Sequence, residues 1–348
     1  KRAATIQTIW AQTTLAHKIT LLQQVSANLL NNQQQYASII TTEMGKPILQ
    51  AVAEIKKCAA LCDYYCTNAE NLLKDKSITT TNSKSYVCYR PLGVVFVIMP
   101  WNFPFWQVLR FAVPNLLAGN AGVLSHALNA TQAALCIEKI FLQAGFPEGL
   151  FRSLIVHDDM AEFIINNSHV RGVTLTGSAR AGKVVAACAG KALKKVVLEL
   201  GGSDPYIILE DADLEQAATA CVTSRLNNAG QVCIAAKRII VVAAVRDKFE
   251  QLVLQKAKSY VCGDPMHEQT MLGPMARDDL RQKIHEQVLG CIQSGARCVL
   301  GGEIIEGPGF YYPATVLFDV QQDSPVFKEE LFGPVICIIP AKDENEAI

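Results

Sequence analysis

The 348-residue sequence predicts an α/β protein with two doubly wound parallel-sheet domains and a small β excursion. Continuous apolar runs rich in valine and isoleucine alternate with helical stretches, which is typical of strands buried on both faces of a parallel sheet. The alternation is interrupted at Gly201-Gly202 and then begins again. A separate stretch rich in threonine and serine has no helical period and indicates exposed β structure.

The first part of the chain is expected to be a set of packed helices, because apolar side chains recur at spacings of three and four from Ile6 to Leu73. The β excursion follows at Ser77–Tyr89, and its edge is suited to pairing with another subunit. We therefore predict a first domain made of residues 1–76 and 91–201, interrupted by an oligomerisation excursion at 77–90.

The first sheet begins with Leu92–Met99, a continuous apolar run. Its further strands are expected near Gly122-Val123-Leu124 and over Phe151–Val156, Val170–Leu175 and Lys195–Leu200, with helices over Thr131–Ala144 and Ala179–Ala189. A second domain, residues 202–348, begins with strands over Tyr206–Leu209 and Arg238–Val242 and helices over Leu214–Arg225 and Asp247–Ser259. A helix between successive strands is the connection that parallel strands need.

The composition excludes several classes of protein. The chain has 32 basic and 32 acidic residues, so no bulk charge attracts it to nucleic acid or to an anionic membrane. It has no apolar run of about 18 residues, so no membrane span is expected. Its 12 cysteines are scattered through apolar segments, which favours reduced thiols in a cytoplasmic protein. Cys58, Cys62 and Cys66 share one helical face and are interpreted as packing residues, so no metal site is predicted.

Cys233 is the candidate nucleophile. A polar, glycine-containing turn at residues 227–232 precedes it, and a strand follows. Such a turn can expose a thiol at a cleft, whereas the other eleven cysteines fall in predicted helix or strand interiors. A nucleophilic cysteine needs this access. An ordinary loop cysteine is the alternative, and position alone favours it.

Glu199 is the candidate general base. It ends a strand predicted to be buried, directly before Leu200 and the double glycine. Burial raises the pKa of a carboxyl group toward the value that a general base needs near neutral pH. A structural salt bridge with Lys194 or Lys195 is the alternative.

Two further strand ends carry polar groups. Asn102 lies between Pro100 and Pro104, which fix the backbone, and its amide is suited to donate to a developing oxyanion. The alternative is a rigid loop packed by aromatic side chains. Gly177 and Ser178 begin a helix whose free amides suit a pyrophosphate. An N-cap at Ser178 is the alternative, and the local sequence favours it.

In their order along the chain, these segments resemble the aldehyde dehydrogenase family. The family's pattern is Pro-Trp-Asn-Phe-Pro, Thr-Gly-Ser, Glu-Leu-Gly-Gly, Gly-Gln-x-Cys and Glu-x-Phe-Gly-Pro, and the chain matches each in order. The last match is Glu330-Leu331-Phe332-Gly333-Pro334. The resemblance implies an aldehyde dehydrogenase-like fold that forms homodimers or homotetramers. It also implies that the first domain binds NAD(P) and that residues 202–348 form a catalytic domain, incomplete at its C-terminus.

The resemblance assigns roles residue by residue. It implies that Cys233 attacks the aldehyde, that Asn102 holds the oxyanion, and that Glu199 activates the water that hydrolyses the thioester. It implies that Glu330 contacts the nicotinamide ribose and Phe332 the ring. The cofactor-binding residues carried over are Trp101, Ser125, Gly177, Ser178, Glu330 and Phe332.

The cofactor is expected to be NAD or NADP, and the sequence leaves the choice open. Ser125 and Leu128 stand where the family usually has a lysine and a glutamate that contact the adenosine ribose. The absence of a carboxylate at Leu128 removes one obstacle to a 2′-phosphate.

The expected substrate is a small aldehyde, most specifically succinate semialdehyde. Segments 201–205, 230–238 and 272–277 resemble the bacterial succinate-semialdehyde dehydrogenase branch. Arg110 stands where those enzymes bind the substrate's carboxylate, and a guanidinium fork suits that task. Asn227 stands where some of them have a second arginine. A helix-surface ion pair is the alternative for Arg110, and the two interpretations are equally favoured.

Two other functions stay open at this point. Coenzyme A instead of water would resolve the thioester in an acylating enzyme, but Glu199 argues against it because hydrolysis is the step that needs a base. A catalytically inert remnant is the second alternative, because the sequence begins at Lys1 without a start methionine and stops at Ile348 without a terminating signal.

Overall fold

The computed structural model describes residues 1–348, and the chain divides into two compact units. Unit 1 contains residues 1–40 and 52–200, and unit 2 contains residues 41–51 and 201–348. Each unit is built around its own five-stranded sheet, which confirms the predicted α/β class with two sheets.

The sheet of unit 1 is parallel throughout, with the order β5-β4-β3-β6-β7. Its strands are β3 (Val94–Met99), β4 (Ala121–His126), β5 (Phe151–Leu154), β6 (Val170–Gly177) and β7 (Lys195–Leu200), at the places that the apolar runs predict. The chain proceeds from β3 toward β5 and then continues on the other side of β3 with β6. Open α/β sheets bind ligands at such a switch point, beyond the carboxyl ends of the strands.

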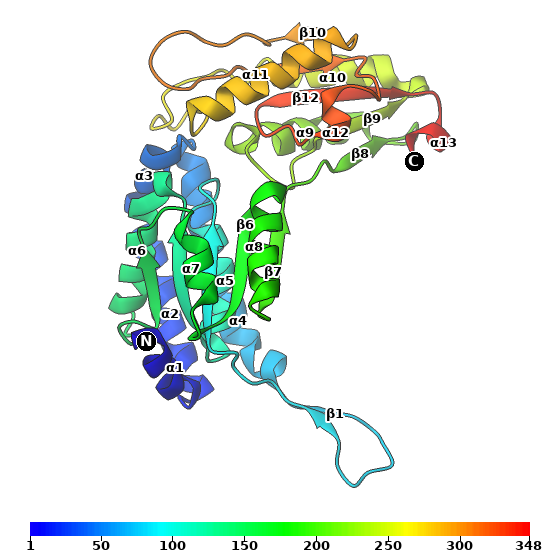
Figure 1. Ribbon diagram of the computed structural model, residues 1–348. Coiled ribbons are helices and arrows are strands. Elements are labelled where there is room, and N and C mark those ends of the chain that lie inside the picture. Colours follow the sequence, from blue (N-terminus) through cyan, green and yellow to red (C-terminus); the bar gives the residue numbers. More distant parts are fainter. The chain divides into compact units, whose positions relative to one another are not determined.

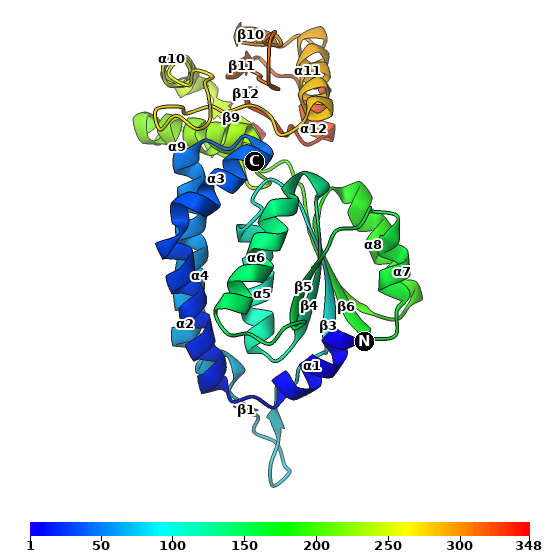
Figure 2. The same ribbon diagram turned by 90° about the vertical axis from the view of Figure 1, so that its left-hand side faces the viewer.

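Helices cover both faces of this sheet, as Figure 2 shows for α5 and α6 on one face and α7 and α8 on the other. These helices are α5 (Trp106–Leu117), α6 (Thr131–Gln143), α7 (Met160–Asn166) and α8 (Ala179–Lys191), with the short 3₁₀ helix η1 at Leu128–Ala130. The N-terminal helices are α1 (Arg2–Ala11), α2 (Leu15–Asn31), α3 (Gln33–Met44) and α4 (Ile48–Leu73), which confirms the helical prediction. None of the helices is long and apolar enough to cross a membrane.

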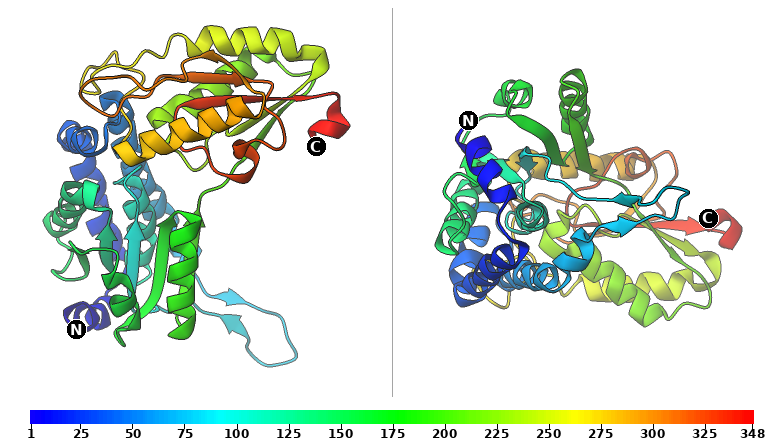
Figure 3. Two further views of the ribbon diagram at one scale, coloured as in Figure 1. Left: turned by 45° about the horizontal axis from the view of Figure 1, so that its top comes forward. Right: turned by 90° about the horizontal axis from the view of Figure 1, so that it is seen from below.

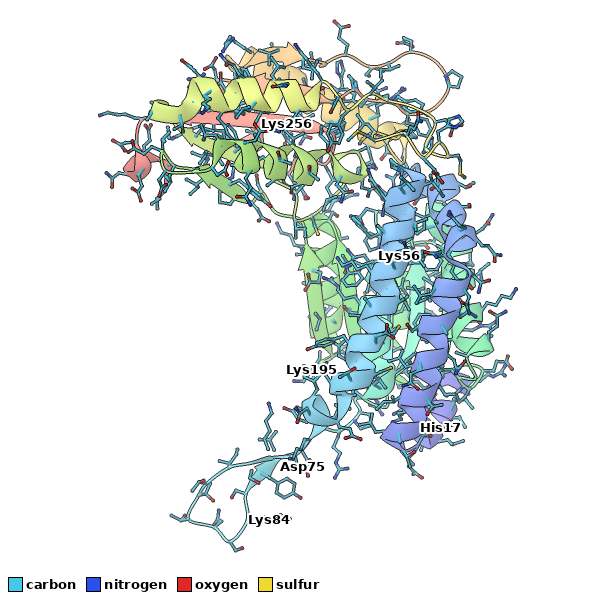
Figure 4. All side chains as sticks on the ribbon, turned by 180° about the vertical axis from the view of Figure 1, so that it is seen from behind. His17, Lys56, Asp75, Lys84, Lys195 and Lys256 are labelled. Carbon is cyan, nitrogen blue, oxygen red and sulfur yellow. The ribbon has the colours of Figure 1, made fainter.

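The predicted β excursion is a two-stranded antiparallel ribbon of β1 (Lys76–Ser77) and β2 (Tyr86–Val87). It projects away from the sheet of unit 1, with Lys84 near its tip (Figures 1 and 4). Ile78, Tyr86 and Val87 are exposed on it. Pairing of this ribbon with another subunit stays a prediction.

Strand β7 corrects one expectation, because this strand, which contains Glu199 as its penultimate residue, is not buried. It lies at the edge of the sheet and has β6 as its only neighbour. Its side chains are largely exposed, including Val197, and the side chain of Glu199 is 55% exposed. The run of valine and leucine resembles that of a central strand. Strand β7, however, is hydrogen-bonded to a neighbouring strand on one side only, and its other side is open.

The sheet of unit 2 has the order β10-β11-β12-β9-β8, and only β10 at its edge is antiparallel to its neighbour. Its strands are β8 (Pro205–Ile208), β9 (Arg238–Val242), β10 (Arg297–Leu300), β11 (Thr315–Phe318) and β12 (Val335–Ala341). The helices are α9 (Leu214–Leu226), α10 (Arg246–Ala257), α11 (Asp278–Gln293), α12 (Pro325–Lys328) and α13 (Glu344–Ala347), with 3₁₀ helices η2 (Asn227–Gly230) and η3 (Ala243–Val245). Figure 3 shows α10 and α11 on opposite sides of this sheet.

The cysteines largely follow the sequence expectation. Cys58 and Cys62 are fully buried on α4, which confirms their interpretation as packing residues, and burial raises the pKa of the Cys62 thiol. Two cysteines do not follow it. Cys88 is exposed after β2, and Cys262 lies in an irregular segment, so the expectation that all eleven lie inside helices or strands is wrong. No group of three or more metal-ligating side chains gathers in the chain.

Candidate active site

In unit 1, two of the predicted segments lie at the same edge of the sheet. Strand β3 ends at Met99 and leads into the loop 100–105, where Trp101 and Asn102 are buried. The neighbouring strand β6 ends at Gly177, and Ser178 begins α8. Because parallel strands share their carboxyl edge, both segments flank the switch point between β3 and β6.

Two buried side chains hold the loop 100–105 in place. The Glu54 carboxylate on α4 accepts hydrogen bonds from the backbone amides of Phe105 (2.9 Å) and Trp106 (3.0 Å), so it caps the first turn of α5. His126, at the end of β4, donates from Nε2 to the carbonyl of Pro104 at 3.0 Å. Burial lowers the pKa of His126 to about 4, so the ring is neutral at pH 7. Neither Glu54 nor His126 was predicted from the sequence.

The start of α8 has donors for an anion. Ser178 is its N-cap, with Oγ accepting from the amide of Ala181 at 3.2 Å, which confirms the cap interpretation. The first two amides of the helix stay available, because a helix leaves its first donors without internal partners. The hydroxyl of Thr176, two residues before the cap, is buried without a hydrogen-bond partner. Together these groups suit a phosphate or pyrophosphate.

Arg110 on α5 and Glu199 on β7 form an ion pair, with Nη2 and Oε2 3.5 Å apart. The helix-surface ion pair considered for Arg110 is therefore present. The salt bridge considered for Glu199 has a different partner than expected, because Lys194 donates instead to the carbonyl of Asn167 at 2.6 Å. Both members of the pair are more than a third exposed, so it contributes at most about 1 kcal/mol to stability. A second carboxylate could therefore replace Glu199 at Arg110 with little loss of free energy.

Two other positions at the carboxyl edge of this sheet differ in accessibility. Ser125, the penultimate residue of β4, is buried. Leu128, in the following 3₁₀ helix, is 48% exposed. The side chain of Leu128 is therefore exposed to solvent at the position where the family usually has a glutamate.

In unit 2, Cys233 is half-buried in a turn between α9 and β9. The turn begins with three consecutive left-handed residues, Asn228 (φ 52°), Ala229 (φ 51°) and Gly230 (φ 71°). Left-handed backbone is unfavourable for alanine, although asparagine tolerates it, so other contacts must hold Ala229 in this conformation. A Cβ atom on Gly230 would lie 2.0 Å from the carbonyl oxygen of Gly333, so the backbones approach too closely for any side chain.

Arg225, at the end of α9, supplies one of these contacts. Its side chain is fully buried and donates to the carbonyls of Val335 (2.6 Å), Leu331 (2.8 Å) and Gly230 (3.5 Å). Burial lowers the pKa of Arg225 to about 10, which leaves the guanidinium charged at neutral pH. It therefore joins the turn before Cys233 to the segment 331–335.

Two glutamines complete the support of this turn. Gln231 donates to the carbonyl of Asn228 at 3.0 Å and accepts from the amide of Ala276 at 3.0 Å. The side-chain oxygen of Gln50 accepts from the amide of Asn228 at 2.8 Å. In the sequence, Gln231 is only part of the Gly-Gln-x-Cys motif, and its two hydrogen bonds explain why a glutamine stands there.

Glu330 and Phe332 follow α12, and Phe332 is half-buried. The Glu330 carboxylate pairs with Lys237 at 2.5 Å. Lys237 is a residue that sequence reasoning missed, because a lysine four positions after Cys233 has no sequence feature that distinguishes it from a surface lysine. Within unit 2 the structure thus connects Glu330 to the turn of the candidate nucleophile.

Known proteins resemble this chain over most of its length. A sequence model described as the aldehyde dehydrogenase family matches residues 1–348. A probable succinate-semialdehyde dehydrogenase [NADP(+)] of Synechocystis sp. is 46% identical over 327 residues, covering 94% of this chain and 72% of the relative. The succinate semialdehyde dehydrogenase [NAD(P)+] of Escherichia coli is 46% identical over 339 residues, covering 97% and 73%. A solved structure of succinic semialdehyde dehydrogenase from Streptococcus pyogenes with NADP+ superposes with a TM-score of 0.97 at 37% identity, covering 100% of this chain and 76% of that one.

Proposed function

The chain belongs to the aldehyde dehydrogenase family, and from that premise we propose that it oxidises succinate semialdehyde to succinate with NAD or NADP. The coarser statement, an NAD(P)-dependent aldehyde dehydrogenase, follows from the family and its similar relatives. The more specific proposal names the substrate and the residues. The observation that carries it is the guanidinium of Arg110, which lies beside the Glu199 carboxylate near the end of β7.

Residues of both units have roles in the proposed reaction. The thiolate of Cys233 attacks the aldehyde carbon and forms a C–S bond. The resulting oxyanion accepts hydrogen bonds from the Asn102 side chain and from the backbone amide of Cys233. Once the aldehyde carbon has been oxidised, the product is a thioester on Cys233. Glu199 takes a proton from water, which attacks the thioester carbonyl, and the C–S bond breaks to release the acid and the thiolate.

The exposed position of Glu199 suits this last step. A base that must reach a water molecule and then release its proton benefits from contact with solvent. The same base favours hydrolysis over transfer to coenzyme A, because a thiol acceptor does not need a carboxylate to activate water. A requirement for coenzyme A in turnover would overturn this part of the proposal.

The residues at the switch point of unit 1 fit a dinucleotide. The buried, unpartnered hydroxyl of Thr176 and the open amides at the start of α8 are donors suited to its phosphates. Trp101, Ser125, Gly177 and Ser178 would line the same site, and Glu330 and Phe332 of unit 2 would contact the nicotinamide ribose and ring. When bound, the dinucleotide supplies the hydride acceptor for the oxidation. Leu128 places no negative charge against a 2′-phosphate, so we propose that both NAD and NADP are used.

The substrate's carboxylate is proposed to bind Arg110. Its guanidinium already pairs with one carboxylate, and that pair is weak and exposed. Binding of an acidic aldehyde would therefore replace Glu199 at Arg110 and leave Glu199 available as the base. A neutral aldehyde offers no such exchange.

The test compares succinate semialdehyde with butanal, which has the same chain length and no carboxylate. Arg110→Met is expected to lower kcat/KM for succinate semialdehyde by about 10- to 100-fold, because one charge-assisted hydrogen-bonded contact is lost. The kcat/KM for butanal should change less than about threefold. Initial rates of NADH and NADPH formation at 340 nm give both values.

A matched control is Arg2→Met, since Arg2 also pairs with a glutamate on the surface of unit 1, Glu148 at 2.6 Å. It should leave both substrates unaffected. An equal loss for both substrates in Arg110→Met would show that Arg110 serves only its ion pair with Glu199, and would remove succinate semialdehyde as the preferred substrate. We also propose that the active form is a homodimer or homotetramer, which sedimentation would measure.

A further inference from the structure

Lys237 directly precedes β9 and is completely buried. Its ammonium donates to the carbonyl of Gly202 at 2.6 Å, to the carbonyl of Cys233, and to the Glu330 carboxylate at 2.5 Å. An ammonium group has three protons, and here each has an acceptor. The buried charge is therefore fully paired, which is the condition under which such burial is tolerated.

These three acceptors come from three separate segments of unit 2. Gly202 belongs to the double glycine at which the chain returns to unit 2, Cys233 to the nucleophile's turn, and Glu330 to the segment after α12. Lys237 is thus the point at which the turn of the proposed nucleophile and the proposed ribose ligand are joined.

The Glu330 carboxylate has little freedom to rotate. One oxygen accepts from Lys237, and the other lies so close to the backbone of Gly201 that a Cβ atom there would be 1.9 Å away. The backbone carbonyl of Glu330 also accepts from Gln287 at 3.3 Å. The side chain nevertheless stays 26% exposed, so it is fixed and still reachable by a ligand.

We propose that Lys237 is a positioning residue that holds Glu330 ready for the cofactor's ribose and couples that carboxylate to the turn of Cys233. This inference rests on the proposed function for the identity of the ligand. Lys237 touches neither the substrate nor the cofactor in this scheme and acts only through the groups that it holds. The hydrogen bonds of Lys237 predict two separable effects of its removal, one on the affinity for the cofactor and one on the reactivity of the Cys233 thiol.

The first effect is measured by titrating the purified protein with NAD and NADP and following protein fluorescence. Lys237→Met is expected to raise the Kd of the preferred cofactor at least about 10-fold, because the freed carboxylate loses its fixed orientation. Glu330→Gln should raise it by a similar factor. If Lys237 acts through Glu330, the double variant K237M/E330Q loses no more affinity than either single variant. Additive losses, or an unchanged Kd in a folded Lys237→Met protein, would overturn the proposal.

The second effect is the rate at which iodoacetamide alkylates Cys233, measured by mass spectrometry of its peptide. Lys237→Met should change this rate at least about threefold, because the turn loses its bond to the carbonyl of Cys233. Glu330→Gln should leave the rate unchanged, since Lys237 still holds both backbone carbonyls. Equal alkylation rates in all of these proteins would contradict the coupling.

The matched control is Lys256→Met. Figure 4 labels Lys256, which lies on α10, and it forms an ion pair with Glu215 of the same unit. This variant should change neither measurement. If Lys237→Met does not fold, Lys237→Gln keeps donors in the buried position and is judged by the same two readouts. A wild-type protein that binds the cofactor but oxidises no aldehyde would disprove the proposed function alone, since affinity and alkylation are still measurable.

Discussion

The two units hold their candidate functional groups by different means. In unit 2, the turn of Cys233 is fixed by buried cations, since Arg225 and Lys237 are both fully buried and donate to backbone carbonyls. In unit 1, the loop of Asn102 is held by a carboxylate cap and a neutral histidine, and Glu199 has only an exposed ion pair.

This difference matches the different demands of the two proposed chemical steps, attack by Cys233 and activation of water by Glu199. A nucleophile has to meet the aldehyde carbon in one geometry, and buried charge-assisted bonds make departures from that geometry costly. A base that serves a mobile water molecule needs to move, and an exposed pair permits motion. The comparison therefore predicts that changes in unit 2 affect the whole reaction, whereas changes at Glu199 affect only its second half.

The largest effect is expected from Cys233→Ala compared with Glu199→Gln. The first should abolish turnover, because no covalent intermediate forms. The second should lower steady-state turnover at least about 100-fold and still release roughly one NAD(P)H per subunit in a rapid burst, since the base acts only after oxidation. Stopped-flow absorbance at 340 nm separates the two.

The control is Cys88→Ala, which removes an exposed cysteine from the excursion and should leave turnover unchanged. Absence of a burst in Glu199→Gln would break the comparison, because Glu199 would then be needed before the thioester forms.

The next effect concerns stability. Arg225→Met should lower the free energy of unfolding by about 4 kcal/mol, because three buried carbonyls lose their donor. Urea denaturation at pH 7 measures this loss. Arg297→Met provides the contrast, since Arg297 pairs with Asp319 at 2.5 Å but is 59% exposed. Its loss should be about 1 kcal/mol or less, and equal losses would contradict the role assigned to burial.

The smallest effect is expected at His126, the neutral histidine that holds the loop of Asn102 in unit 1. Burial lowers the pKa of His126 from 6.5 to about 4, so between these values the unfolded chain binds a proton that the folded histidine does not. The contribution of His126 to the free energy of unfolding is complete above pH 6.5. It is lost as the pH falls from 6.5 to 4, by about 3 kcal/mol in total. Urea midpoints at pH 7.5 and 4.5 should therefore differ less in His126→Gln than in the wild type.

His17→Gln is the control for this measurement, because His17 is exposed on α2 (Figure 4). It should keep the pH dependence of the wild type. A His126→Gln protein as acid-sensitive as the wild type would show that other groups cause the loss.

Much of the fold was predictable because apolar runs and helical periods report burial directly. Val94–Met99 and Val170–Gly177 are strands where such runs stand. The place of a strand within its sheet is a tertiary property, and so Lys195–Leu200 was expected to be buried although it is an edge. Beyond residue 260 no helix or strand was given bounds from the sequence, so the bounds of β10, β11 and α11 come from the structure alone.

The candidate site was predictable only where motifs resemble a family. Cys233, Glu199 and Asn102 were named in this way, and their roles stay predictions. Arg225 and Lys237 were missed for a physical reason, because charged residues are mostly exposed and a buried one has no local signature. Glu54 was missed similarly, since its partners Phe105 and Trp106 are about fifty positions away along the chain.

Gly201 and Gly230 bear on how proteins of this kind can be altered in the laboratory. Each stands where another part of unit 2 lies within about 2 Å of an absent Cβ atom, a carboxylate oxygen of Glu330 in one case and the backbone of Gly333 in the other. Neither glycine has a reactive group. Any side chain at Gly230 would collide with the backbone of Gly333, whereas a side chain at Gly201 would displace the Glu330 carboxylate from its place beside Lys237. Effort to retarget the enzyme is better spent at Arg110, where the neighbouring atoms are exposed and the surroundings tolerate change.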